Sequence, residues 1–186
     1  MSKDFTKRLN QVKDRLLSDE LLTNAGLGNE IGFYIFDYPP EFELEVRKHL
    51  EHILPQMPIN VSAINLFELL VDYLKREDIY DSAKEMQIES GDTELANALE
   101  GVLEGGLIAP EIVRASQFEE NDLIIIYGIG NSYPLLRTHD LLNNLQPILG
   151  NTPLVIFYPG KYSGQTLSLF GKLKDENYYR AFRLVP

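Results

Sequence analysis

The residues best suited to bind a ligand follow an apolar run in the last third of the chain. Gly128, Gly130, Asn131 and Ser132 come directly after Leu-Ile-Ile-Ile-Tyr, and Arg137 follows them. Free backbone amides at the start of a helix attract anions, and a guanidinium one turn further on can add forked hydrogen bonds. This stretch is therefore a candidate anion-binding site. A tight turn selected for packing, with Arg137 in a structural ion pair, is the alternative that the sequence leaves open.

Two phosphate-binding motifs are incomplete in this chain. Pro159-Gly-Lys-Tyr-Ser has the Gly-Lys pair of a Walker loop, but Val155 stands where the first glycine belongs and Tyr162 replaces the hydroxyl residue. Gly128 and Gly130 match only two glycines of the dinucleotide fingerprint, and they follow a late strand rather than the first. We therefore expect no ATP hydrolysis.

Side chains suited to catalysis do not form a recognisable constellation. His139 and Asp140 are neighbours, but consecutive residues on a helix point roughly 100° apart. His49 and His52 share a predicted helix face without a third histidine nearby in sequence, and the chain has no cysteine. Asp37 precedes two prolines and is interpreted as a turn former. We predict a protein that is not an enzyme, with no metal site and no cofactor.

The elements that position these residues alternate between strands and helices. Apolar runs predict core strands at residues 31–36, 59–64, 123–127 and 154–158. Helical spacing predicts helices at residues 5–22, 41–54, 66–76 and 134–149, the last capped by Ser132. Residues 24–29 are a predicted turn, and residues 166–170 and 178–184 are predicted final strands, for which a hairpin is one arrangement.

Residues 77–118 interrupt this alternation with three predicted helices, at 80–87, 93–103 and 110–116. Between residues 77 and 104, nine acidic residues face one lysine, so this stretch contributes a charge of about −8. We predict a single α/β domain over residues 1–186, with a largely parallel sheet and flanking helices. Its layout is expected to be like a P-loop core that lacks the phosphate loop, with residues 77–118 as an inserted acidic helical lobe.

The composition restricts the partners that are expected. A net charge of −11 over 186 residues disfavours unaided binding to nucleic acid, because phosphate attraction dominates that affinity. No apolar run approaches the length of about 18 residues that a membrane span needs, and the amino terminus lacks the apolar core of a secretory signal. We therefore expect a cytoplasmic protein that contacts no membrane.

Six short segments resemble the BrxB family. They are Leu-Gly-Asn-Glu near Gly28, Phe-Asp-Tyr-Pro-Pro-Glu at 36–41, Tyr-Pro-Leu-Leu-Arg-Thr-His with Leu-Leu-Asn-Asn-Leu at 133–145, Phe-Tyr-Pro-Gly at 157–160, Leu-Phe-Gly at 169–171, and Asn-Tyr-Tyr-Arg-Ala-Phe-Arg-Leu at 177–184. The resemblance implies a role in bacteriophage exclusion (BREX), beside a PglZ-type protein, a PglX-type adenine methyltransferase and a large ATPase. It supplies no catalytic residues.

The resemblance predicts an assembly or adaptor subunit of a BREX complex. Aromatic and arginine side chains are good interface anchors, so we expect partners to contact a face rich in them. The residues of this predicted contact face are Tyr133, Arg137, His139, Lys161, Tyr162, Tyr178, Tyr179 and Arg180. The alternative is a regulatory subunit that senses a nucleotide or phosphate at the turn from Gly128 to Arg137.

Overall fold

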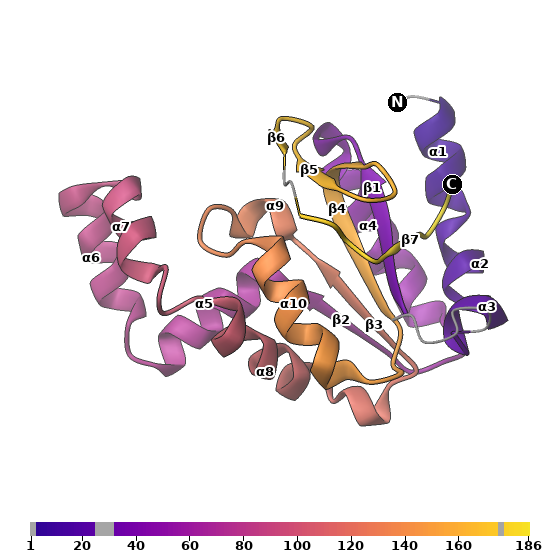
Figure 1. Cartoon of the computed structure of the whole chain (residues 1–186), viewed down its shortest axis with the longest axis horizontal. Helices are drawn as coiled ribbons and strands as arrows, with labels where there is room; N and C mark the ends of the chain where they lie inside the picture. The colour runs from indigo at the N-terminus through magenta and orange to yellow at the C-terminus, as the bar shows by residue number, and fades with distance from the viewer. Residues whose placement is uncertain (1–2, 25–31, 175–176) are drawn as a thin grey trace.

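The computed structural model describes residues 3–24, 32–174 and 177–186, and it shows a sheet between two layers of helices (Figure 1). Five strands run parallel in the order β2-β3-β4-β1-β7; β5 pairs antiparallel with β4, and β6 pairs antiparallel with β5. The strands are β1 (Phe33–Tyr38), β2 (Val61–Asn65), β3 (Leu123–Tyr127), β4 (Leu154–Tyr162), β5 (Leu167–Leu169), β6 (Leu173–Lys174) and β7 (Phe182–Arg183). The predicted α/β class with a largely parallel sheet is confirmed.

Helices connect these strands and cover both faces of the sheet. They are α1 (Lys3–Asn10), α2 (Val12–Leu16), α3 (Asp19–Leu22), α4 (Glu43–Ile53), α5 (Leu66–Arg76), α6 (Tyr80–Ser90), α7 (Asp92–Leu99), α8 (Gly105–Ser116), α9 (Ile129–Ser132) and α10 (Thr138–Leu149). Three short 3-10 turns complete the described elements, at Pro40–Phe42, Leu54–Gln56 and Phe118–Glu120. None of the helices in the described ranges is long and apolar enough to cross a lipid bilayer.

Strand β1 shows how the sequence divides the core into two halves. Phe33 and Ile35 belong to the core beneath α5, α8 and α10. Tyr34 and Phe36 belong to the core beneath α1, α2 and α4. All six residues of β1 are buried, which is typical of a parallel strand covered on both faces.

The carboxyl-terminal part of the sheet differs from the prediction. Strand β4 continues to Tyr162 instead of ending at residue 158, because β5 pairs antiparallel with its last residues. The hairpin partner of β5 is β6, whereas β7 pairs parallel with β1. The amide of Leu184 donates to the carbonyl of Ile35 at 2.9 Å, which holds the end of the chain beside β1. A predicted hairpin between residues 166–170 and 178–184 is therefore wrong.

Two predicted helix boundaries are also wrong. The single predicted helix at 5–22 is three helices. The first break lies at Gln11, and the second lies at Ser18, which is extended and whose side chain accepts a hydrogen bond from Leu21 N as the cap of α3. The helix predicted from Pro134 begins only at Thr138, because Arg137 is extended and is the N-cap of α10. The turn predicted at residues 24–29 lies outside the described residues except for Asn24. Ile31, the first residue of the strand predicted at 31–36, also lies outside them.

Helices α6 and α7 pack on each other and project from the body of the molecule (Figure 1). Helix α8 instead packs along α10, and Ile108 and Ile112 of this helix are fully buried in the core. The projecting part is therefore shorter than the predicted lobe of residues 77–118. Helix α8 also begins at Gly105, before the predicted start at Pro110, which lies inside the helix.

Candidate functional site

Most of the candidate residues lie around the carboxyl edge of the parallel strands, whereas Tyr178 and Arg180 line a separate cleft beside Gly164. Helix α4, which follows β1, covers one face of the sheet, and α10, which follows β3, covers the other. Connections that leave towards opposite faces open a crevice at this edge, where α/β proteins usually bind their ligands. Both β4 and the β5–β6 hairpin extend over this edge, so they shape the surface there.

The glycine turn after β3 differs in geometry from the predicted capped helix start. Gly128 has φ +76° and leads into α9, which has only four residues. Ser132 is fully buried, and its hydroxyl donates to the carbonyl of Gly128 at 3.2 Å. Ser132 therefore stabilises the turn instead of capping the next helix. Of the five predicted anion-site residues, Arg137 alone lines one of the clefts described below, on an element separate from this turn.

The β5–β6 hairpin is fixed against α9 by one aromatic residue. Phe170 at the hairpin turn has φ +56°, a left-handed conformation that is unfavourable for a bulky residue. A Cβ on Gly130 would lie 2.9 Å from the Phe170 ring and 3.0 Å from Pro159, so the glycine permits this close contact. Tyr133 meets the same ring edge-on, with the ring centres 6.5 Å apart. Three of the segments that resemble the BrxB family therefore meet here.

Asp37 joins four separate parts of the chain. One carboxylate oxygen accepts from Arg8 at 2.8 Å and from Arg183 at 2.7 Å, and the other accepts from the Tyr162 amide at 3.0 Å. Arg8 also donates to the carbonyl of Val185 at 3.1 Å. The predicted role of Asp37 as a simple turn former missed this cluster. Its partners lie far away in the sequence, so no local pattern could have revealed them.

Two clefts flank the hairpin turn at the carboxyl edge. The β1-side cleft, of about 610 Å³, lies over Asp37 and includes Arg8, Lys161 and Arg183. The α10-side cleft, of about 510 Å³, lies between the start of α10 and the hairpin. Lys172 lines both clefts. Basic side chains therefore surround both openings, although the chain as a whole is acidic.

The structure divides the predicted contact face into exposed and buried residues. Tyr133, Arg137, Lys161, Tyr178 and Arg180 are exposed. The guanidinium groups of Arg137 and Arg180 have no hydrogen bond or ion pair with any residue that the structure describes. These five side chains are available to a partner.

The other three predicted contact residues support the fold. The Tyr162 hydroxyl donates to the carbonyl of Ala181 at 2.6 Å, and burial is the main cause of its raised pKa. Tyr179 is buried, and its ring meets His139 edge-on at 5.8 Å. His139 is half-buried, and its Nε2 lies 2.9 Å from the Asn143 side-chain nitrogen. Tyr162 and Tyr179 therefore hold the carboxyl-terminal segment in place and do not present a contact surface.

The other histidines lie on α4, away from the clefts. His49 is half-buried, and burial, followed by the charge of His52, lowers its pKa. Its Nε2 is buried without a hydrogen-bond partner among the described residues. Within the described ranges, no three side chains of the His, Cys, Asp and Glu types are grouped as ligands for one metal ion.

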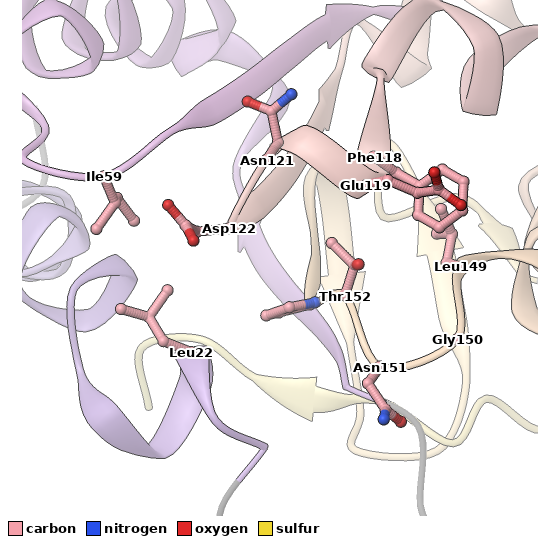
Figure 2. A pocket seen from close by; sticks show the side chains of 11 residues that line it. Leu22, Ile59, Phe118, Glu119, Asn121, Asp122, Leu149, Gly150, Asn151 and Thr152 are labelled. Carbon is pink, nitrogen blue, oxygen red and sulfur yellow. The ribbon is translucent and has the colours of Figure 1, made fainter.

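Another cleft lies at the opposite edge of the sheet, where β3 and β4 begin (Figure 2). It has a volume of about 550 Å³, and no sequence motif pointed to it. Glu119 and Asp122 are the charged side chains among its described lining residues. Asp122 accepts a hydrogen bond from the Asn60 amide at 2.9 Å, so this carboxylate already has a structural role. Its acidic lining disfavours a phosphate-bearing ligand.

The fold and the site define a three-layer α/β protein with basic clefts at the carboxyl edge of a parallel sheet. The model of the family described as BREX protein BrxB matches residues 62–184. The chain belongs to the BrxB family. It is 40% identical to a BREX protein BrxB of Escherichia coli (strain HS) over 96% of this chain and 90% of that protein. It is 35% identical to a BREX protein BrxB of Bacillus cereus over 97% of each chain.

No solved structure matches the chain. The family assignment confirms the resemblance seen in the short segments. Membership makes this a BREX-system protein, which is consistent with phage defence.

Proposed function

We propose that this chain is a non-enzymatic adaptor of a BREX phage-defence complex, which acts by contacting other proteins of that complex. The observation that carries the proposal is the group of exposed basic and aromatic side chains around the carboxyl edge. Arg137 and Arg180 have guanidinium groups that no described residue neutralises. Tyr133 lines the α10-side cleft with Arg137, and Tyr178 lines a separate cleft with Arg180; both tyrosines are exposed. Such side chains dominate the binding energy of many protein interfaces.

The projecting helices α6 and α7 offer a second surface of opposite charge. Ile88 is 85% exposed and Met86 is 38% exposed, although both are apolar. Acidic residues predominate around them, with Lys84 as the one lysine between residues 77 and 104. Charge of one sign steers the approach and orientation of a partner more than it adds affinity. This surface suits a basic partner, whereas the carboxyl edge suits an acidic one.

The partners to test first are a PglZ-type protein and a PglX-type methyltransferase. We propose that the complex supports host DNA methylation and phage restriction, and that this subunit works in the cytoplasm. It would need no cofactor and no direct contact with DNA on its own. Sustained turnover of a phosphate ester by the purified chain would contradict the non-enzymatic role.

Charge reversal provides the test. The double variant Arg137→Glu and Arg180→Glu should reduce capture of the partner in a pull-down by about tenfold or more, because each change places like charges against an acidic surface. A matched control is Lys7→Glu with Lys48→Glu, which makes the same charge change at exposed positions on α1 and α4. Circular dichroism should show that both double variants are folded.

The control separates a local contact from a general effect of charge. Equal losses in both double variants would show that net charge governs capture. Unchanged capture in the Arg137 and Arg180 variant would show that the contact surface lies elsewhere.

A further inference from the structure

The α10-side cleft combines an apolar floor with a basic rim. Its floor includes the buried side chains of Ile129, Leu136 and Leu169. Its rim carries Arg137, Lys172 and Lys174, all of which are exposed. A cleft of about 510 Å³ is within the size range of small-molecule sites. This pairing of apolar and charged walls is suited to a ligand that has both kinds of surface.

The positive charge of this rim is not neutralised by the cleft itself. Asp140 is the one carboxylate among the described lining residues. Its Oδ2 accepts from the Gly105 amide and its Oδ1 accepts from the Asn144 side chain at 3.2 Å, so it already has partners. The Arg137 guanidinium has no described partner. Among the described lining residues, three cations therefore stand beside one occupied carboxylate, in a protein of net charge −11.

The start of α10 adds to this positive field. Arg137 is the N-cap of this twelve-residue helix, and no side chain caps it by hydrogen bonding. The first amides of a helix lack partners within the helix, and its dipole favours negative charge there. The helix start therefore supplements the three cationic side chains.

The cleft is held open before a ligand arrives. The hairpin that carries Lys172 and Lys174 is paired with β4 and fixed by Phe170 against Gly130. A preformed site binds more tightly because less conformational entropy is lost on binding. The β1-side cleft differs, because Asp37 already pairs with both of its arginines. The α10-side cleft is thus the better anion site of the two.

We propose that the α10-side cleft binds a small molecule with phosphate groups and an apolar ring, the chemistry of a nucleotide. The phosphates would lie against Arg137, Lys172 and Lys174. The exposed ring of Tyr133 and the apolar floor would receive the ring of the ligand. This binding activity does not depend on the proposed adaptor role, although both use Tyr133 and Arg137.

Calorimetric titration of the full chain with ATP tests the proposal, with pyrophosphate and adenosine as separate probes. ATP should bind saturably, pyrophosphate more weakly, and adenosine most weakly of the three. Arg137→Ala and Lys174→Ala should each weaken ATP binding by about tenfold, because each removes a charge-assisted hydrogen bond. Lys161→Ala is the matched control, since it removes one exposed lysine that lines only the β1-side cleft. Thermal melts should show that all three variants are folded.

Three results would overturn the proposal. The first is no binding of ATP by the folded wild-type chain at millimolar concentration. The second is a loss in Lys161→Ala as large as the loss in Arg137→Ala and Lys174→Ala, which would place the ligand in the other cleft. The third is binding of adenosine as tight as that of ATP, which would show that the phosphates make no contact. The pull-down with BREX partners is independent of each of these results.

Discussion

The carboxylate of Asp37 offers the most direct test of the fold, through the variant Asp37→Ala. It receives three hydrogen bonds, from Arg8 at 2.8 Å, Arg183 at 2.7 Å and the Tyr162 amide at 3.0 Å. The side chains of Asp37 and Arg8 are only 10% and 16% exposed, whereas that of Arg183 is 33% exposed. Removing the carboxylate therefore leaves the Tyr162 amide without its acceptor and the Arg8 charge without its counter-ion, although Arg8 keeps its hydrogen bonds to the carbonyls of Asp37 and Val185.

The expected loss of stability follows from this geometry. Removing one partner of a buried ion pair costs about 3–5 kcal/mol. Arg183 can regain part of its hydration at the surface, so we expect about 3 kcal/mol for Asp37→Ala. Asp37→Asn keeps an acceptor of the same shape but loses the charge, so we expect a smaller loss of about 1–3 kcal/mol. Native proteins are stable by only about 5–15 kcal/mol, so both losses are measurable.

Urea denaturation followed by circular dichroism measures these losses. Asp72→Ala is the matched control, because its carboxylate is 76% exposed and lies 3.5 Å from Lys75. An exposed pair of this kind contributes less than about 1 kcal/mol. A loss below about 1 kcal/mol for Asp37→Ala would refute the assignment of Asp37 as the centre of the cluster. Equal losses in the two alanine variants would refute it as well.

Three other local features give further predictions. Gly160→Ala should lower the free energy of unfolding by about 1–3 kcal/mol, because its Cβ would lie 2.2 Å from a carbonyl of β5. In the control Gly101→Ala, the added Cβ meets no atom within 4 Å, so stability should change little. Urea denaturation compares the two variants. The pKa of His49 is lower in the folded state than in the unfolded state, where it is about 6.5. The contribution of His49 to the free energy of unfolding is therefore complete above this unfolded pKa and falls as the pH drops below it. In His49→Gln, the melting temperature should depend less on pH between about pH 7 and 5 than in the wild type. An unchanged pH dependence would contradict this prediction. Leu103→Ala should lower the free energy of unfolding by about 2–5 kcal/mol, because this residue is fully buried. Ile88→Ala, at an 85% exposed position, should have little effect on the denaturation midpoint. Similar midpoints for the two variants would contradict the burial of Leu103 in the core.

Two elements have the bounds that the local sequence pattern predicted. Helix α5 has the predicted bounds of residues 66–76, because Asn65 caps it and its apolar spacing is regular. Strand β3 has the predicted bounds of residues 123–127, because it is an uninterrupted apolar run buried in the core. The P-loop-like layout and the acidic lobe as an inserted unit stay predictions.

Long-range contacts explain what the sequence did not predict. The Asp37 cluster joins residues that are 29, 125 and 146 positions apart, and residue spacing carries no information on such contacts. Strand β7 has only two residues, too few for an alternation pattern. The prediction took residues 178–184 as one strand, so it could not reveal that Tyr179 is buried against His139. The sequence pointed to Tyr133, Arg137 and His139 in one cleft and to Lys161 and Tyr162 in the other. It did not point to Lys172 and Lys174.

The central position of β1 has a consequence for synthesis on the ribosome. Strand β1 ends at Tyr38, but its neighbours β4 and β7 begin only at Leu154 and Phe182. The nascent chain must therefore carry an apolar strand with two unpaired edges until most of the protein has been translated. Such a segment is prone to aggregation before its partners emerge. Products truncated before residue 154 should be captured by chaperones or degraded, since both edges of this strand would stay open.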